Sequence, residues 1–292
     1  MPAETAWPNL EARVAAVTHR GLVRPGNEDA FLVGGLIGLA PHGPMPGPVS
    51  VVHALGPGPV PDRGLVLAVA DGLGGHRAGE TASRLALEGL ARGWAEARAE
   101  TADAACSFWR DTLERTHRTV CMEAATRPEQ AGMAATIAGV HLHAGWGAVT
   151  FHAGDSRVYR FRQGILKPLT VDHSQAEALR SEGPFGVETP RGSSVVWKCL
   201  GSRSDSLDPT VEWTAPALHP GDRYLLVTDG LSDVVDHDAA EAILAERPDP
   251  REAVETLLER ALARGGPDNV TIVLADVVGV ERPGSPGPGG EE

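Results

Sequence analysis

Residues 65–76 read LVLAVADGLGGH, six apolar residues followed by Asp71 and Gly72. An apolar run of this length that ends in a turn-forming pair is typical of a buried β-strand. The arrangement recurs at residues 225–230, LLVTDG, where a second apolar run ends in Asp229. A single Asp-Gly pair is an ordinary turn signal. The recurrence is therefore what makes these two aspartates candidates for a function.

Further acidic residues stand at the borders of other apolar runs. Glu28 and Asp29 precede residues 30–33, Asp155 follows residues 151–154, and Asp268 precedes residues 270–275. Carboxylates that converge at strand ends are partly desolvated and repel one another, which raises their pKa values unless a cation neutralises them. The pattern favours a site for hard divalent cations.

The residue types suit Mg²⁺ or Mn²⁺ because these ions accept carboxylates, backbone carbonyls and waters. Gly72 has no side chain, so its backbone can approach closely and its carbonyl is a candidate ligand. Two such ions held close together activate a bridging water and hold a phosphoryl group. The alternative for each aspartate is a turn or cap residue without a ligand role.

The rest of the chain mixes strand and helix patterns. Apolar residues at helical spacing predict amphipathic helices over residues 79–100 and 104–126, and Asp249-Pro250 predicts the start of a third. Strands are expected at 13–19, 30–33, 65–70, 195–200, 223–228 and 270–278, with a run of short strands between 136 and 169. Because strands dominate the middle and helices come in pairs, an α+β layered domain is expected over residues 1–281.

Two segments have a different composition. Residues 34–64 contain 15 Gly or Pro in 31 positions, and most of this insertion is expected to form an irregular surface loop. Residues 282–292, RPGSPGPGGEE, are expected to be a disordered tail.

Composition excludes several classes of partner. The chain carries 26 Lys and Arg against 39 Asp and Glu, a net charge of −13, which disfavours binding to nucleic acid or an anionic membrane. No apolar run reaches the roughly 18 residues of a membrane span. Three cysteines without CxxC spacing fit a reducing cytoplasm, and no secretory signal is visible at residues 1–10. We therefore expect a cytoplasmic protein.

Six motifs span residues 20–271: RGLVRPGNED at 20–29, DGLGGH at 71–76, GDSR at 154–157, LTVDHS at 169–174, DGLSD at 229–233 and DNVT at 268–271. Together, and in this order, they resemble the motifs of the metal-dependent Ser/Thr protein phosphatases of the PP2C type (the PPM family), in their bacterial form. The resemblance implies an αββα sandwich, in which two central antiparallel sheets are flanked by helix pairs. It also implies a flap over residues 174–200.

The resemblance assigns roles to individual residues. It implies that a two-metal centre, of Mn²⁺ or Mg²⁺, is ligated by Asp29, Asp71, Asp229, Asp268 and the carbonyl of Gly72, with Glu28 acting through a water. A third metal would lie at Asp155, with Asp229 and Asp233. Arg24 would hold the substrate phosphate, since a guanidinium offers phosphate a planar pair of donors.

The implied activity is hydrolysis of phosphoserine and phosphothreonine in proteins, in opposition to a bacterial Ser/Thr kinase. The alternative is a catalytically silent relative that binds metal or phosphoprotein. A silent relative is expected to lack at least one aspartate of the two-metal centre, and all four are present. The general acid is left open, because Leu73 follows Asp71-Gly72 where some members carry His; His76 is one candidate, and His173 is expected to be structural.

Overall fold

Two antiparallel six-stranded sheets lie face to face in the computed structural model, which describes residues 9–39, 50–74, 77–174, 196–201 and 207–281. The first sheet has the order β11 (Ile165–Pro168), β10 (Arg157–Arg162), β13 (Arg223–Val227), β14 (Val270–Glu281), β1 (Asn9–His19), β4 (Ser50–Pro59). The second has the order β12 (Thr210–Ala215), β9 (Gly147–Ala153), β8 (Ile137–His143), β5 (Leu65–Ala70), β2 (Ala30–Val33), β3 (Leu36–Leu39). A short pair, β6 (Gly72–Leu73) and β7 (Ala134–Ala135), extends one end.

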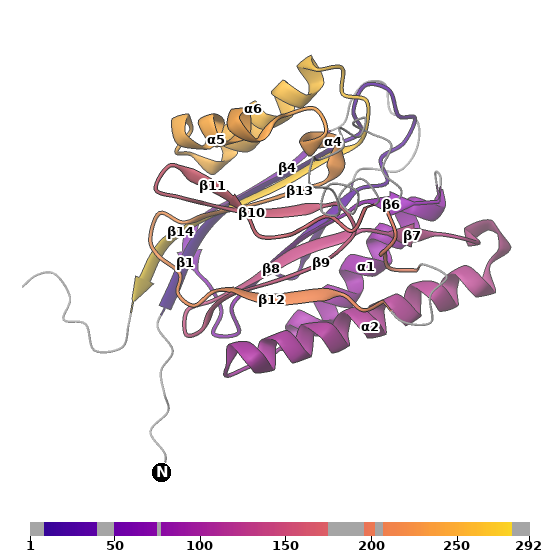
Figure 1. The fold of residues 1–292 in the computed structure, drawn as a ribbon, viewed down its shortest axis with the longest axis horizontal. Helices are drawn as coiled ribbons and strands as arrows, with labels where there is room; N and C mark the ends of the chain where they lie inside the picture. Colours follow the sequence, from indigo (N-terminus) through magenta and orange to yellow (C-terminus); the bar gives the residue numbers. More distant parts are fainter. Residues whose placement is uncertain (1–8, 40–49, 75–76, 175–195, 202–206, 282–292) are drawn as a thin grey trace, which may run out of the picture.

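Helices cover the outer face of each sheet (Figure 1). The second sheet packs against α1 (Arg77–Glu96) and α2 (Ala102–Thr126), and the first against α4 (Asp229–Ser232), α5 (His237–Glu246) and α6 (Pro250–Ala263). A 3₁₀ turn, Pro128–Gln130, follows α2. The predicted αββα sandwich, with its helix pairs, is confirmed.

The core explains why β5 is apolar at every position. Its six side chains are all buried, but they face alternate layers: Leu67 and Val69 pack between the two sheets, whereas Val66 and Ala68 pack under α1 and α2. A strand buried on both faces requires a continuous apolar run. The third apolar layer lies between the first sheet and helices α4 to α6.

The start of α6 is as predicted. The Asp249 carboxylate accepts hydrogen bonds from the backbone N–H groups of Arg251 (2.9 Å) and Glu252 (3.2 Å), and Pro250 occupies the first helical turn. These contacts satisfy donors that have no partner within the helix.

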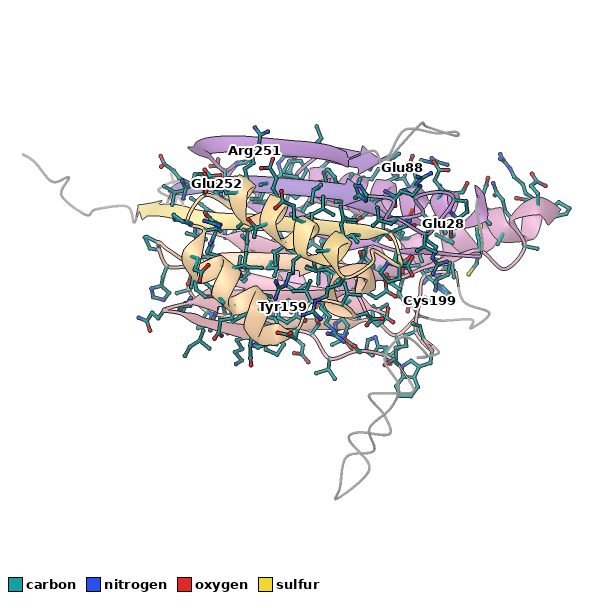
Figure 2. All side chains as sticks on the ribbon, turned by 90° about the horizontal axis from the view of Figure 1, so that it is seen from above. Glu28, Glu88, Tyr159, Cys199, Arg251 and Glu252 are labelled. Atoms are coloured by element: carbon teal, nitrogen blue, oxygen red, sulfur yellow. The ribbon has the colours of Figure 1, made fainter. Side chains whose placement is uncertain are left out.

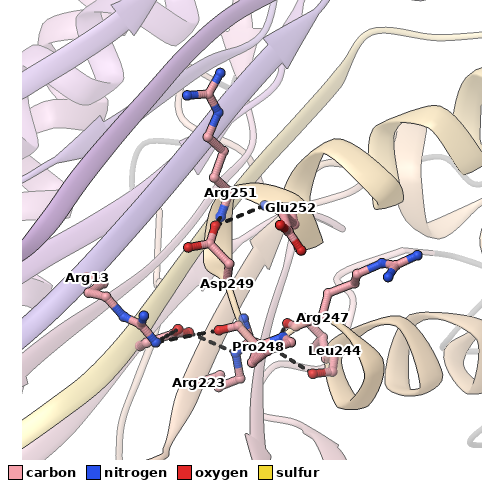
Figure 3. A network of polar contacts seen from close by, with 9 residues as sticks. Arg13, Arg223, Leu244, Arg247, Pro248, Asp249, Arg251 and Glu252 are labelled. Carbon is pink, nitrogen blue, oxygen red and sulfur yellow. Dashed lines mark hydrogen bonds and ion pairs between the residues drawn. The ribbon is translucent and has the colours of Figure 1, made fainter.

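An ion-pair network around Asp276 holds the end of α5 to the first sheet (Figure 3). Asp276 of β14 pairs with Arg223 of β13 at 2.8 Å and with Arg13 of β1 at 3.2 Å. Arg223 Nη1 also donates to the carbonyls of Leu244 (2.6 Å) and Arg247 (2.7 Å) at the end of α5. One guanidinium thus neutralises a buried carboxylate and caps a helix C-terminus.

Two predictions about secondary structure are wrong. Within residues 34–64, most of which were predicted to be an irregular loop, residues 36–39 and 50–59 are strands β3 and β4. Both are edge strands, so each has hydrogen-bond partners on one side only, and the N–H that Pro57 and Pro59 lack in β4 is not required on the outer side. Residues 196–200 form no regular strand. They make only isolated bridges to two different segments, Ser174 with Val196 and Ala135 with Leu200.

Some predictions concern residues that the structure does not describe. The tail at 282–292 lies outside the described residues, as does most of the flap region, residues 175–195. The single domain over residues 1–281 stays a prediction. Within the described parts of the chain, no helix has the length and apolarity needed to cross a bilayer.

Candidate metal centre

Strand pairing in the second sheet places two of the predicted ligands at the same end of two neighbouring strands. Ala30, the first residue of β2, pairs with Ala70, the last residue of β5. Asp29 directly precedes β2 and Asp71 directly follows β5, so both lie just beyond the same end of these two strands. Asp29 is almost fully buried, with 2% of its surface exposed.

The first sheet contributes the other pair in the same way. Val227 at the end of β13 pairs with Ile272 near the start of β14. Asp229 follows the first of these strands, as the first residue of α4, and Asp268 precedes the second. In Figure 1, α4, which covers the first sheet, and the short pair of strands β6 and β7, which follows β5 of the second sheet, lie at the same end of the sandwich.

A threonine hydroxyl joins the two sheets at this end. Thr228 Oγ1 donates a hydrogen bond to Asp29 Oδ2 at 2.8 Å and accepts one from the backbone N–H of Thr271 at 3.0 Å. Thr228 is fully buried. It therefore fixes a carboxylate of the second sheet relative to the backbone of the first.

Asn269 fixes the loop that carries the first motif. Its Nδ2 donates to the carbonyls of Arg20 and Gly26, both at 2.8 Å, and its Oδ1 accepts from the N–H of Glu28, also at 2.8 Å. One side chain thereby satisfies three backbone groups of residues 20–28. It holds that loop against the loop that contains Asp268.

Glycines allow a close approach around Glu28. A Cβ on Gly79 of α1 would lie 2.0 Å from Glu28 Oε2, and a Cβ on Gly72 would lie 2.0 Å from the carbonyl oxygen of Gly79. The N–H of Gly72 also donates to the carbonyl of Glu28 at 3.2 Å. Glu28 and the Gly72 backbone thus meet at the first turn of α1, and Figure 2 shows Glu28 at the same end of the sandwich as Cys199.

The carboxylates influence one another electrostatically. Burial raises the pKa of Asp29 to about 7, although the hydrogen bond from Thr228 acts in the opposite direction. Burial, followed by the negative charge of Asp229, raises the pKa of Asp71 well above its ordinary value. Burial and then the charge of Asp155 do the same to the pKa of Asp229. Several acidic groups thus share one poorly solvated region.

Asp155 belongs to the same region. It follows β9 and is 8% exposed. Burial raises its pKa to about 6, and the charges of Asp172 and Asp233 act in the same direction. Asp233 is thus close enough to Asp155 to interact, and their assignment to a third metal stays a prediction.

Arg24 lies at the surface of the site. Its Nη2 is 2.5 Å from Asp268 Oδ2, and 55% of its side chain is exposed. An exposed ion pair contributes roughly 0–1 kcal/mol. Arg24 is therefore able to exchange this carboxylate for another oxyanion at little cost.

The donor set fits a hard divalent cation. It consists of carboxylates and one glycine carbonyl, and the raised pKa values of Asp29, Asp71 and Asp229 show that ionised carboxylates here need a counter-charge. As the side chains stand, however, the described residues contain no group of three or more His, Cys, Asp or Glu that could hold an ion. Asp29 and Asp268 are hydrogen-bonded to Thr228 and Arg24 instead. The structure thus gathers the predicted ligands in one region, and their binding of metal is a proposal.

From the sequence, His76 is a candidate general acid and His173 is expected to be structural. His76 lies outside the described residues. His173 stacks on His152 with ring centroids 4.4 Å apart, accepts from the N–H of Gly154 at 3.3 Å, and contacts Thr210 Oγ1 at 3.1 Å. These contacts agree with the structural role predicted for it.

Sequence reasoning missed the residues that hold the site together. Thr228 and Asn269 stand beside predicted ligands but received no role. Thr136 also has no role in the sequence analysis, yet its hydroxyl accepts from the N–H of Asp71 at 3.1 Å and contacts Ser156 Oγ at 2.8 Å. A Thr or Asn next to a strand-end aspartate is a signal that could have drawn attention to these positions.

Solved structures of bacterial Ser/Thr phosphatases have the same fold as this chain. The chain matches, with a TM-score of 0.72 and 31% identity, a crystal structure of the Mycobacterium tuberculosis serine/threonine phosphatase PstP, covering 92% of this chain and 100% of that one. A structure of the PstP catalytic domain in complex with two manganese ions matches with a TM-score of 0.71 and 31% identity, with the same coverage of both chains. The fold is therefore that of bacterial Ser/Thr phosphatases.

The sequence comparisons identify the family. The sequence model described as Protein phosphatase 2C matches residues 59–264. Over 280 residues the chain is 33% identical to M. tuberculosis PstP, covering 92% of this chain and 46% of that protein, so it spans about half of PstP's length. It is 30% identical over 220 residues to the serine/threonine phosphatase stp of Listeria monocytogenes, covering 74% of this chain and 85% of that protein. The chain belongs to the protein phosphatase 2C family.

Proposed function

We propose that this chain is a metal-dependent protein serine/threonine phosphatase that acts in the cytoplasm and opposes a bacterial Ser/Thr kinase. Its substrates are phosphoserine and phosphothreonine in proteins. The observation that carries the proposal is the convergence of strand-end aspartates from both sheets in a chain of the protein phosphatase 2C family.

Asp29, Asp71, Asp229, Asp268 and the Gly72 carbonyl would hold two Mn²⁺ or Mg²⁺ ions, and Glu28 would act through a water. Asp155, with Asp229 and Asp233, would hold a third. Such ions supply a nucleophilic water at neutral pH and neutralise charge on a phosphoryl group. The manganese in the structure of the related PstP catalytic domain supports this choice of ion.

The chain's own side chains bind and orient the substrate. The exposed guanidinium of Arg24 is proposed to leave Asp268 and donate two parallel hydrogen bonds to the substrate phosphate. Thr228 keeps the Asp29 carboxylate oriented, and Asn269 keeps the Arg24 loop in place.

The first experiment is hydrolysis of p-nitrophenyl phosphate with and without Mn²⁺. Wild type should show Mn²⁺-dependent turnover, and Asp229→Asn should lose several orders of magnitude in rate. Asp236→Asn is the matched control, because Asp236 caps α5 from an exposed position and Asn is an equally good cap. Absence of Mn²⁺-dependent turnover in the wild type would favour the silent relative, and full activity in Asp229→Asn would reject the site assignment.

The second experiment separates Arg24 from the metal ligands. Arg24→Ala should raise KM for a phosphopeptide at least tenfold and leave Mn²⁺ affinity, measured by calorimetry, within about twofold. A large loss of Mn²⁺ affinity in this variant would contradict the assignment of Arg24 to the phosphate.

A further inference from the structure

A cavity of about 340 Å³ lies on the outer side of the first sheet, and none of the proposed metal ligands lines it. It is open to solvent on one side and is lined by β10, β11 and β13, by residues 170–172, and by residues of α4 and α5. Figure 2 labels Tyr159, one of its lining residues, in the region that these helices cover. Nothing in the proposed reaction uses this cavity.

Most of its lining is apolar and rigid. Leu225 and Val227 of β13 and Leu231 of α4 line it, together with Val235 and Ala240, and all five are buried in the layer between the sheet and its helices. An apolar lining on a sheet and packed helices gives a cavity whose shape is largely formed in advance. It favours a ligand with an apolar body.

The charged groups of the cavity already neutralise each other. Arg157 makes a two-pronged ion pair with Asp172, with Nε to Oδ1 at 2.9 Å and Nη2 to Oδ2 at 2.7 Å. The lining therefore offers a bound molecule no unbalanced charge from this pair. A charged ligand would lose its hydration here without gaining a counter-ion.

Four polar side chains line the cavity besides this ion pair: Tyr159, Thr170, Ser232 and His237. Ser232 Oγ is buried, lines the cavity's α4 side, and has no hydrogen-bond partner among the described residues. Buried hydroxyls are seldom left without a partner. Tyr159 Oη accepts from Arg157 Nη1 at 3.4 Å and so retains its own proton to donate. The cavity thus combines apolar walls with a small number of hydrogen-bonding groups, as small-molecule sites do.

The volume limits the size of the ligand. An apolar cavity of about 150 Å³ holds one benzene molecule. A cavity of 340 Å³ has room for a body of two fused rings or an equivalent aliphatic group.

We propose that the cavity between β10, β13, α4 and α5 is a binding site for a small uncharged molecule with an apolar body of about two rings and one hydrogen-bonding group that meets Ser232. The proposed metal ligands do not line the cavity, and the inference does not depend on phosphatase activity. Its test therefore uses the full chain in EDTA, where metal binding and hydrolysis play no part.

The probe is 2-naphthol, compared with naphthalene and with naphthalene-2-sulfonate. We expect 2-naphthol to bind saturably with a Kd of about 0.1–1 mM, which is typical of a ligand of this size. In ¹H–¹⁵N spectra it should shift the amides of residues 225–240. The sulfonate should bind at least tenfold more weakly, because the Arg157 charge is already neutralised. No saturable 2-naphthol binding, shifts confined to other regions, or sulfonate binding as tight as that of 2-naphthol would overturn the proposal.

Two variants and a control locate the site. Ala240→Phe fills the cavity and should weaken 2-naphthol binding at least tenfold, whereas Ala242→Phe, on the exposed face of the same helix, should leave it unchanged. Ser232→Ala should weaken 2-naphthol about fivefold, as loss of one uncharged hydrogen bond predicts, and leave naphthalene unaffected. The Ser232 result tests the site even if Ala240→Phe does not fold. Unchanged 2-naphthol affinity in a folded Ala240→Phe, or in Ser232→Ala, would refute the assignment.

Discussion

Replacing Thr228 by Val tests whether one hydroxyl holds the two sheets together at the candidate metal centre. Val has nearly the shape of Thr, so the change removes the hydroxyl with little change in packing. Thr228 is fully buried, donates to Asp29 at 2.8 Å, and accepts from the N–H of Thr271 at 3.0 Å. The variant therefore leaves one buried backbone donor and one buried carboxylate without this partner.

The structure sets the size of the effect. An unsatisfied buried N–H costs about 1–3 kcal/mol, and a hydrogen bond to a charged group contributes about 1.5–3 kcal/mol. Burial of the added methyl returns about 0.8 kcal/mol. We expect the free energy of unfolding to fall by about 2–4 kcal/mol, with the urea dependence unchanged. Because Thr228 orients a proposed ligand, Mn²⁺ affinity should also fall about 10–100-fold.

The assay is urea unfolding in EDTA, followed by calorimetric titration with Mn²⁺. Thr256→Val is the matched control, because the Thr256 hydroxyl donates only to the Glu252 carbonyl of its own helix, at 2.7 Å on the surface. Thr256→Val should change the free energy of unfolding by no more than about 0.5 kcal/mol. If Thr228→Val lowers the free energy of unfolding and the Mn²⁺ affinity no more than Thr256→Val does, the view that this hydroxyl secures the site is refuted.

Three other predictions follow from contacts described above. Gly79→Ala should lower Mn²⁺-dependent hydrolysis at least tenfold, because the added Cβ would lie 2.0 Å from Glu28 Oε2. This loss is expected although Ala favours a helix over Gly by about 1 kcal/mol. Normal activity of the variant in a kinetic assay would contradict the close approach. Arg223→Met should destabilise the fold by about 3–5 kcal/mol in urea, because the buried Asp276 would keep only its contact with Arg13; an effect below about 1 kcal/mol would show that the network adds little. The folded-state pKa of Asp29, about 7, exceeds its unfolded value, so the contribution of this group to stability is lost as pH rises from about 4 to 7. In EDTA, Asp29→Asn should therefore remove part of the decline in the free energy of unfolding over this pH range. Identical pH profiles of stability in wild type and variant would disprove the prediction.

The sequence predicted the places where strands end more reliably than the edges of the sheets. Asp71 and Asp229 were found because a strand buried on both faces must be apolar along its whole length, so its end is visible. Strand β4 was missed because an edge strand tolerates Gly and Pro that a central strand excludes. Local composition therefore described the centre of the sandwich and was misleading at its border.

The scaffold of the site could not be predicted because its contacts join distant segments. Asn269 binds the carbonyls of Arg20 and Gly26, more than 240 residues earlier in the chain. No spacing rule connects such positions, and the value of an Asn side chain there depends on three backbone groups that only the fold brings together. The ligand types were predictable from chemistry, whereas the residues that orient them depend on tertiary structure.

The division of the acidic residues between two sheets has a mechanical consequence. Asp29 and Asp71 move with one sheet, Asp229 and Asp268 with the other, and the gap between the sheets is filled by side chains such as Phe31, Leu67, Leu226 and Val273. Close-packed interiors transmit changes in volume. The thickness of this apolar layer therefore sets how far apart the two halves of the acidic cluster stand. If the cluster binds a cation as proposed, enlarging or trimming a core residue that touches neither half would change its affinity for that cation.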